Sequence, residues 1–164
     1  MKKWLIMIAV VALVLGLTAC GGEEAPAPVQ MEVQQIYTQL SEKVALPAML
    51  TLNDALLLDI CGIQTADVKQ AVVAICEDSL HTDEIWMVEA ADEAAARRIV
   101  ELAQKRLTKK GEESITYSPE QYAVVEKAQL LQNGSYVILL VSPDAADMVS
   151  AVQTITGTVF EKMN

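Results

Sequence analysis

Apolar side chains recur every three or four positions in three separate parts of the chain, and this spacing predicts three amphipathic helices. The first covers residues 30–45. The second begins with Asp92 as its N-cap and ends at Gly111, because glycine often follows the last residue of a helix. The third runs from Ala145 to Phe160 along one apolar stripe.

Two pairs of strands are expected between these helices. Residues 68–77 are rich in Val and Ile, and residues 84–90 follow them after a short connection. Ala128–Gln132 and Ser135–Val141 flank Asn133-Gly134, the dipeptide that favours a type I′ hairpin turn. Each pair should therefore form an antiparallel hairpin.

Two shorter helices complete the pattern. Asn53 can cap a short buried helix, which Gly62 ends. Further along, Ser118 is placed as an N-cap, Pro119 takes the first helical position and Gln121 completes a capping box. One or two helical turns should follow this second start signal.

The resulting order contains two strand–strand–helix units in succession. It predicts an α+β fold in two layers: a four-stranded antiparallel sheet, helices packed on one face, and an amphipathic helix at the N-terminal end. We expect residues 33–164 to form this single domain, because 164 residues are typical of one hydrophobic core.

The start of the chain has the pattern of a targeting segment. Lys2 and Lys3 precede sixteen uncharged residues, from Trp4 to Ala19. A membrane-spanning helix needs about 20 apolar residues, so this run fits a signal peptide better. Leu17-Thr18-Ala19-Cys20 then resembles the lipobox of bacterial lipoproteins.

The lipobox resemblance implies a lipoprotein signal peptide over residues 1–19 and lipid attachment at Cys20. The Cys20 thiol would carry diacylglycerol with acyl chains such as palmitate, and the two chains would give a stable membrane anchor. Residues 20–32 would be the lipidated Cys and a flexible tether. An ordinary secretory signal next to a cysteine, and a disordered terminus without a spacing role, are the alternatives.

The charge balance excludes some classes of partner. The chain has 12 basic and 22 acidic side chains, and residues 1–19 contain two of the basic ones, Lys2 and Lys3. The remainder therefore has 10 basic and 22 acidic side chains, a net charge of −12. Nucleic acids and anionic bilayers are bound through clustered Lys and Arg, so neither is an expected partner of this surface.

Two cysteines remain after Cys20, and they admit two interpretations. On an extracellular surface Cys61 and Cys76 could form a disulfide, and closing a loop of about 15 residues would stabilise the fold by roughly 3 kcal/mol. Both positions also fit core-facing, unpaired thiols. A catalytic thiol would need a positioned base, and His81 is the single histidine of the chain.

A metal site could be drawn between the first two strands from Glu77, Asp78, His81 and Asp83. Their spacing matches no recognised metal motif, and a solvated hairpin loop explains these residues as well. We find no phosphate-binding loop, dinucleotide fingerprint, zinc-type cysteine spacing, calcium loop or nucleophile elbow. The sequence therefore assigns no catalytic residue, no metal ligand and no cofactor.

Four short motifs occur in the order seen in one lipoprotein family: Leu46-Pro47-Ala48-Met49, Gly62-Ile63-Gln64-Thr65-Ala66-Asp67-Val68, Tyr117-Ser118-Pro119-Glu120-Gln121 and Gly134-Ser135-Tyr136-Val137. Over about residues 33–160 the chain resembles domain-of-unknown-function family 4358, lipobox-bearing proteins found mainly in Gram-positive bacteria. The resemblance implies a lipoprotein on the outer face of the cytoplasmic membrane. It brings no established activity or site residues, and Cys61 departs from the aromatic residue expected there.

These observations favour a non-enzymatic module, anchored through Cys20, that binds a protein or cell-envelope partner at the cell surface. A small solute- or metal-binding lipoprotein serving a transporter is the first alternative. A cell-envelope hydrolase or its accessory subunit is the second.

Overall fold

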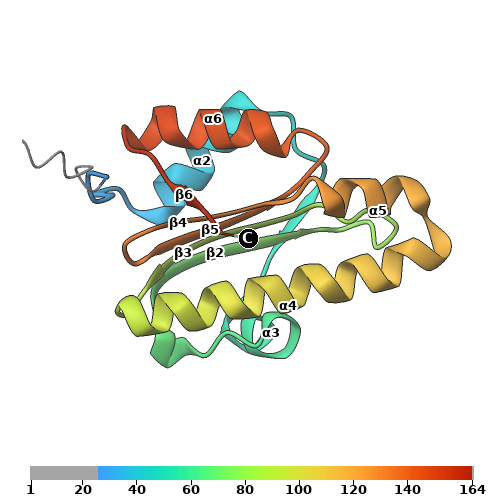
Figure 1. The fold of residues 1–164 in the computed structure, drawn as a ribbon, viewed down its shortest axis with the longest axis horizontal. Coiled ribbons are helices and arrows are strands. Elements are labelled where there is room, and N and C mark those ends of the chain that lie inside the picture. The colour runs from blue at the N-terminus through green and yellow to red at the C-terminus, as the bar shows by residue number, and fades with distance from the viewer. Residues whose placement is uncertain (1–25, 164) are drawn as a thin grey trace, which may run out of the picture.

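A six-stranded antiparallel sheet organises the computed structural model, which describes residues 26–163 (Figure 1). The predicted signal peptide, residues 1–19, and the lipid attachment residue Cys20 lie outside the described residues. Within the described range, no helix combines the length and the apolar character needed to cross a membrane.

The strands follow the order β1-β2-β3-β5-β4-β6 across the sheet. Two hairpins, β2–β3 and β4–β5, form its centre, and β3 pairs with β5 between them. The strands are β1 (Met49–Thr51), β2 (Val68–Cys76), β3 (Glu84–Ala90), β4 (Gln129–Asn133), β5 (Tyr136–Val141) and β6 (Glu161–Lys162). The α+β class and the antiparallel sheet are therefore confirmed, whereas the expected count of four strands was wrong.

Helices cover both faces of the sheet, so the expectation of two layers with helices on one face was also wrong (Figure 1). On one face lie α2 (Val33–Lys43) and α6 (Ala145–Thr156); on the other lie α3 (Asp54–Leu56), the π-helical turn Leu57–Cys61 and α4 (Glu93–Tyr117). A 3₁₀ turn (Thr65–Asp67) precedes β2, and α5 (Pro119–Glu126) follows α4.

Two hydrophobic cores result from this arrangement. In β3, Ile85 and Met87 pack towards α2 and α6, whereas Trp86 and Val88 pack towards α4. All six residues of β5 are buried, and none of them is polar apart from the tyrosine hydroxyl. A strand that is apolar on both faces is typical of a sheet covered on both sides. The apolar residues of β5 therefore indicate three layers, with helices on each face of the sheet.

Two helix ends differ from the sequence prediction. Asp92 caps α4 as expected, with its Oδ1 accepting from the backbone N–H of Ala95 over 2.7 Å. The helix then continues through Gly111 to Tyr117 instead of ending. Conversely, α6 ends at Thr156, because Gly157 takes a left-handed conformation (φ +68°) and reverses the chain before β6.

The β4–β5 hairpin is confirmed, but its turn lies one residue further along than expected. Asn133 pairs with Tyr136, so the two turn residues are Gly134 and Ser135. Of these, Gly134 alone has a positive φ, which excludes a type I′ turn because that turn needs two. Asn133 is buried and its amide bonds the carbonyl of Val159 over 2.9 Å, which holds it in the strand.

The segment expected as the end of a flexible tether is attached to the domain. The carbonyl of Ala27 accepts from Asn133 Nδ2 (3.1 Å) and from Thr158 Oγ1 (2.6 Å). Val29 is buried against the core that α2 and α6 share. The chain is therefore fixed from residue 27 onward, at the end of the sheet that carries the β4–β5 turn.

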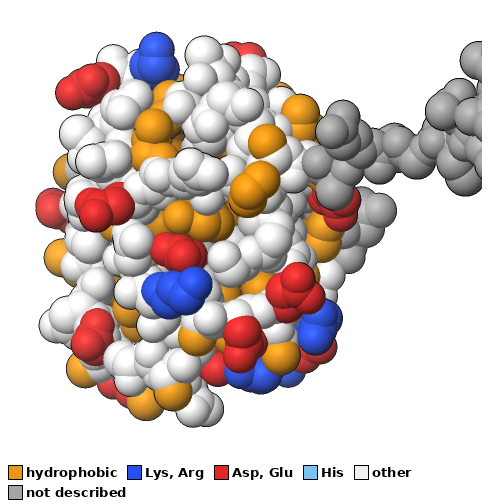
Figure 2. Space-filling model, turned by 90° about the vertical axis from the view of Figure 1, so that its left-hand side faces the viewer, with side chains coloured by type: hydrophobic (Ala, Val, Ile, Leu, Met, Phe, Trp, Pro, Cys, Tyr) orange, Lys and Arg blue, Asp and Glu red, His pale blue; other side chains and the backbone are white. Residues whose placement is uncertain are grey.

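Charged side chains of both signs are interspersed with small apolar groups on the end of the molecule seen in Figure 2. The surface of the described residues also carries ion pairs: Lys69 pairs with Glu89 over 3.3 Å, and Arg98 pairs with Asp67. Such exposed pairs contribute little stability, about 0–1 kcal/mol each. The mixture of both charges in Figure 2 is that of an ordinary solvated surface.

Candidate functional site

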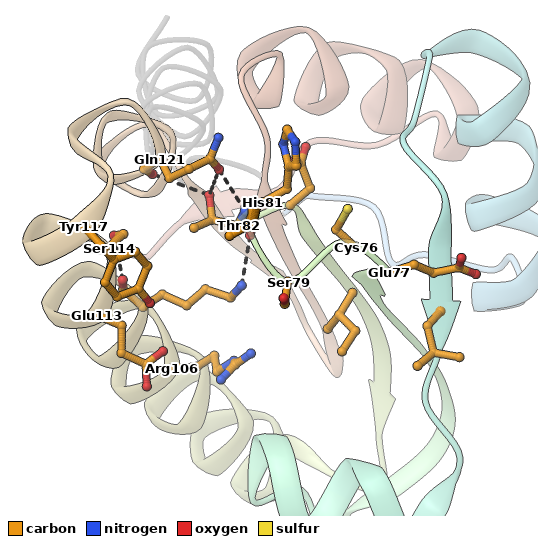
Figure 3. A pocket seen from close by; sticks show the side chains of 15 residues that line it. Cys76, Glu77, Ser79, His81, Thr82, Arg106, Glu113, Ser114, Tyr117 and Gln121 are labelled. Carbon is orange, nitrogen blue, oxygen red and sulfur yellow. Dashed lines mark hydrogen bonds between the residues drawn. The ribbon is translucent and has the colours of Figure 1, made fainter.

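A pocket of about 310 Å³ opens where β2 passes into β3 (Figure 3). Its walls come from β1, the β2–β3 connection (residues 77–83), the second half of α4 and the first turn of α5. Glu84 pairs with Val141 at this end of the sheet, whereas Glu89 pairs with Tyr136 at the other. The pocket and the attached N-terminal segment are thus at opposite ends of the strands.

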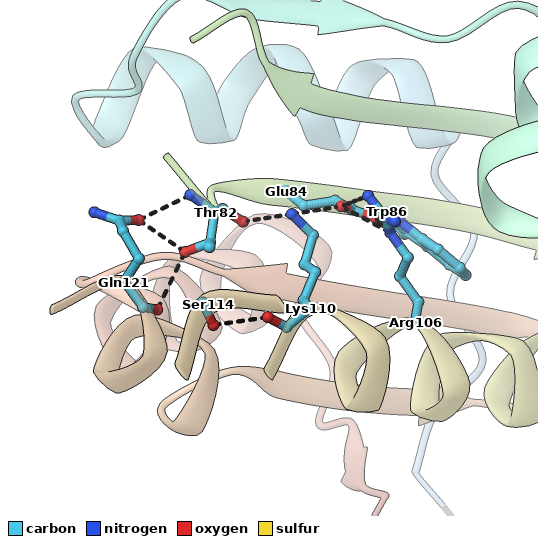
Figure 4. Close-up of polar contacts among 7 residues, drawn as sticks. All are labelled: Thr82, Glu84, Trp86, Arg106, Lys110, Ser114 and Gln121. Atoms are coloured by element: carbon cyan, nitrogen blue, oxygen red, sulfur yellow. Dashed lines mark hydrogen bonds and ion pairs between the residues drawn. The ribbon is translucent and has the colours of Figure 1, made fainter. Parts of the chain in front are cut away.

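Two cations of α4 converge on one buried carboxylate behind the pocket (Figure 4). Arg106 donates from Nε to both oxygens of Glu84 (3.1 and 3.2 Å) and from Nη2 to Oε2 (2.9 Å). Lys110 Nζ lies 3.0 Å from the same Oε2. Residues four apart share one face of a helix, which is why both side chains reach β3.

The remaining contacts of this cluster join it to β3 and to the pocket wall. Trp86, two residues after Glu84 and therefore on the same side of the strand, donates its indole N–H to Glu84 Oε1 over 2.7 Å. Lys110 Nζ also donates to the backbone carbonyl of Thr82 over 2.9 Å. The cluster therefore fixes α4, β3 and the β2–β3 connection to one another.

The electrostatics of the cluster follow from this pairing. Burial would raise the pKa of Glu84, but the Arg106 hydrogen bonds and the charges of Lys110 and Arg106 outweigh it and hold that pKa below its ordinary value. Burial would likewise lower the pKa of Arg106, but its hydrogen bonds to Glu84 and the charge of Glu84, with additions from Cys61 and Glu113, together raise it. Both groups are therefore charged at neutral pH.

Cys61 lies on the same side of the sheet and is a poor nucleophile. Burial, followed by the charge of Glu84, raises the pKa of its thiol to about 12. The thiolate, which is the reactive form, is therefore scarce at neutral pH. Cys61 and Cys76 are both free and buried, so of the two sequence interpretations the structure has the unpaired thiols.

Helix α5 is held to the pocket wall by a contact that replaces half of the expected capping box. Ser118 Oγ accepts from the backbone N–H of Gln121 over 3.3 Å, as the capping interpretation requires. The Gln121 side chain does not return to the cap. Its Oε1 accepts from the backbone N–H of Thr82 (2.8 Å) and from Thr82 Oγ1 (2.9 Å), as Figure 3 shows.

Exposed hydrophobic side chains gather around the mouth of this pocket. Leu50 is 46% exposed, Leu80 is 73% exposed and Tyr117 is 68% exposed. They are three of the six large hydrophobic side chains that the described residues leave exposed. Apolar groups around a polar, charged floor are typical of binding pockets.

The residues from which a metal site could be drawn do not meet. His81 Nε2 lies 3.9 Å from Asp78 Oδ2, and both side chains are about half exposed. Across residues 26–163 there is no group of three or more His, Cys, Asp or Glu that could hold a metal ion. Asp83, another of the four candidate residues, is buried, and this burial together with the charge of Asp144 raises the pKa of its carboxyl group.

The sequence alone does not predict the charged cluster, which consists of Glu84, Trp86, Arg106 and Lys110. Gly111 indicates the end of a helix in the sequence, and this interpretation puts Lys110 in the last helical turn. Two spacings in the sequence could have indicated the cluster. Arg106 and Lys110 stand four residues apart and so share one helix face, and Glu84 and Trp86 stand two residues apart and so share one side of a strand.

Comparison with known proteins gives one match. The model of a family described as a domain of unknown function (DUF4358) matches residues 42–142, a range that contains the whole charged cluster. No curated protein and no solved structure matches the chain.

Proposed function

The chain belongs to the DUF4358 family, whose model covers more than half of its length, and we propose that it is a lipid-anchored binding module without catalytic activity. In this proposal Cys20 carries the lipid on the outer face of the cytoplasmic membrane, and the pocket between α4 and the β2–β3 connection binds a protein partner. The lipobox-like Leu17-Thr18-Ala19-Cys20 supports the anchor.

The observation that carries this proposal is the position of the attached N-terminal segment relative to the pocket. Six Cα–Cα steps separate Cys20 from Pro26, so an extended chain spans at most about 20 Å between them. Because Ala27 is bonded at the β4–β5 turn, a lipid on Cys20 would hold that end of the sheet near the bilayer. The pocket would then open away from the membrane, where a partner can reach it.

The chemistry of the pocket suits binding. Its two cations are held in place by Glu84, and the Cys61 thiol on the same side of the sheet has a pKa of about 12. The three exposed side chains at its mouth, Leu50, Leu80 and Tyr117, offer apolar area to a partner. A protein segment could cover them and gain the free energy of removing that area from water.

A small anionic solute delivered to a transporter is the second candidate, favoured by the same two cations, Arg106 and Lys110. The two candidates differ in what binds. A solute should stabilise the purified chain against heat by itself, by about 2.7 kcal/mol at a hundredfold excess over its dissociation constant. If the ligand is a protein, no small solute tested should stabilise the purified chain, and crosslinking should capture the partner instead.

The decisive experiment places a photo-crosslinking amino acid in the full-length chain in its own cells. Leu80 at the pocket mouth is the test position, and Val159, which is 59% exposed near the opposite end of the sheet, is the control. We expect one protein adduct from position 80 and none of that mass from position 159. Identical adducts from both positions would contradict the proposed site.

The anchor is tested in the same cells with Cys20→Ala. We expect the parent chain to incorporate labelled palmitate and the Cys20→Ala chain to incorporate none. Labelling of the Cys20→Ala chain at the level of the parent would contradict lipid attachment at Cys20, whatever the crosslinking result.

A further inference from the structure

We propose that the pocket recognises the free C-terminal carboxylate of an apolar peptide segment, with Arg106 and Lys110 as the groups that bind it. This inference rests on the proposed function, because it names the chemistry of the partner at the same site. It concerns the N–H groups of Arg106 and Lys110 that are not bonded to Glu84.

Each cation keeps a donor for a ligand. Arg106 uses Nε and Nη2 on Glu84, and its Nη1 has no partner among the described residues. No buried side-chain nitrogen or oxygen in residues 26–163 lacks a partner, so Nη1 is reached by solvent, and Arg106 lines the pocket. Lys110 Nζ has three N–H bonds, of which Glu84 and the Thr82 carbonyl take two.

The directions of these two side chains agree with the presence of unused N–H donors. Figure 3 shows Arg106 extending from α4 into the space that the β2–β3 connection closes on the far side, with Ser79 facing it. Lys110 lines the same pocket and is itself nine-tenths buried. A ligand carboxylate on the floor could accept from both cations, and charge-assisted hydrogen bonds of this kind are the stronger class.

The charge on the α4 side of the sheet favours a monoanion. Arg106 and Lys110 carry two positive charges against the one negative charge of Glu84, which leaves an excess of one. Glu77, Asp83 and Glu113 also line the pocket, and their negative charges repel a dianion more strongly than a monoanion. A carboxylate neutralises the excess, whereas a phosphate dianion would overcompensate it.

The pocket mouth indicates what is attached to the carboxylate. Leu50, Leu80 and Tyr117 surround the charged floor, so the chain that leads to the carboxylate should carry apolar side chains. A volume of about 310 Å³ is at the lower end of the range for ligand pockets, about 300–1,000 Å³. A chain end fits so small a pocket better than a segment that must enter and leave.

Trp86 provides a built-in reporter of occupancy. Its indole N–H bonds the Glu84 oxygen that Arg106 also contacts, so a ligand on the cations should alter its emission. The chain has two tryptophans, Trp4 and Trp86. Trp4→Phe leaves Trp86 as the single emitter in an otherwise full-length chain, kept in detergent micelles.

The experiment titrates this chain with four probes. They are acetyl-alanyl-leucyl-leucine with a free carboxylate, the same peptide as its C-terminal amide, acetyl-leucyl-glutamyl-leucinamide with a side-chain carboxylate, and inorganic phosphate. We expect the free-acid peptide to bind at least tenfold more tightly than each of the other three. Equal binding of the amide overturns carboxylate recognition. Equal binding of the glutamyl peptide overturns recognition of a chain terminus. Tighter binding of phosphate overturns the preference for a monoanion.

Two neighbouring lysines supply a matched pair of variants. Lys110→Met keeps the apolar stem and leaves Arg106 on Glu84, and we expect it to weaken binding of the free-acid peptide at least tenfold. Lys109→Met removes the same charge from an exposed neighbour, 67% exposed, and should change binding less than twofold. Unchanged binding in Lys110→Met overturns the assignment, and the acid-to-amide comparison stays decisive even if that variant fails to fold.

Failure of carboxylate recognition can be distinguished from failure of the proposed function. A specific adduct from position 80 in cells, without preference for the free-acid peptide, retains the binding module and rejects the carboxylate. Preferential binding of the free acid, without any adduct in cells, retains the recognition chemistry and rejects the anchored partner.

Discussion

Trp86 donates its indole N–H to the carboxylate of Glu84 over 2.7 Å, and the two residues stand two positions apart on strand β3. Neither side chain is exposed to solvent. Because alternate residues of a strand point the same way, both side chains face α4, where Arg106 and Lys110 complete the cluster. A single carboxylate therefore holds three donors from two elements and fixes the floor of the pocket.

Removing the charge of Glu84 should destabilise the fold more than any exposed substitution. Glu84→Gln leaves Arg106 and Lys110 buried with one compensating charge fewer, and losing one partner of a buried ion pair costs about 3–5 kcal/mol. The measurement is denaturant unfolding followed by Trp86 fluorescence in the Trp4→Phe background. Glu101→Gln, on the exposed side of α4, is the control and should stay within about 0.5 kcal/mol of the parent.

The advantage of Glu84 over Gln should depend on pH in a defined direction. Burial would raise the pKa of Glu84, but its hydrogen bonds to Arg106 and Lys110 and the charges of both cations together outweigh burial and hold the folded-state pKa below the ordinary value of 4.5. A group with a depressed folded pKa contributes stability that is present above the unfolded pKa and is lost as pH falls through the folded pKa. Hence the difference in unfolding free energy between parent and Glu84→Gln should be constant near neutral pH.

Below about pH 4.5 that difference should shrink steadily, because the unfolded Glu84 is already protonated there. Asp83, whose pKa is raised by burial, has the opposite dependence, but both proteins contain it and its effect cancels in the difference. Unfolding curves at a series of pH values from neutral to acid measure the effect. A difference that grows towards low pH would contradict the assigned sign.

The elements that the sequence predicts best are those with strong local signals. Asp92 and Ser118 are side-chain caps whose hydrogen bonds depend on residues three positions away, so they can be identified without the fold. The limits of β3, residues 84–90, agree with the structure because the apolar run of residues 85–88 fills its centre and Asp83 precedes it. Local chemistry decides such positions.

Other features depend on contacts that are distant in sequence. Asn133 extends β4 because Ala27, 106 residues away, and Val159 accept from its amide. Gln121 leaves its capping role because Thr82, 39 residues away, offers two donors. The edge strands β1 and β6 have three and two residues, too few for an alternating pattern to be visible. These features follow from the assembled sheet.

Three glycines should respond differently to alanine. Gly62 has φ +73°, and a Cβ there would lie 3.1 Å from Leu102 Cδ2, so Gly62→Ala combines backbone strain of about 1–2 kcal/mol with a side-chain shift. Gly157 has φ +68° with open space around it, so Gly157→Ala should cost the strain alone. Gly111 lies inside α4, and Gly111→Ala should stabilise by about 0.5–1 kcal/mol.

The order of these three variants is the test, and chemical denaturation of each chain measures it. A Cβ at Gly111 would meet Tyr122 Cε2 at 3.6 Å, an ordinary contact. Destabilisation by Gly111→Ala would therefore mean that α4 ends near this glycine, as the sequence indicated. Equal costs at Gly62 and Gly157 would mean that Leu102 moves away freely.

The attachment of the N-terminal segment should depend on Asn133. Its Nδ2 donates to the carbonyls of Ala27 (3.1 Å) and Val159 (2.9 Å), and Asn133→Ala leaves these carbonyls with fewer donors at a cost of about 1–3 kcal/mol. Because Ala27 then keeps one bond, to Thr158, the segment around Val29 should open more often. Limited digestion with thermolysin, with cleavage at Val29 followed by mass spectrometry, measures this opening.

Gln132→Ala provides the matched control for this variant. Gln132 is the neighbouring residue of β4, and its amide bonds the Gly134 carbonyl at the surface over 2.9 Å. Its removal should leave cleavage at Val29 unchanged, whereas Asn133→Ala should accelerate cleavage severalfold. Equal rates in the two variants would show that burial of Val29, and not the Asn133 amide, holds the segment. Under the proposed anchoring through Cys20, the length of the chain between Cys20 and Pro26 would still limit how far the β4–β5 end lies from the bilayer.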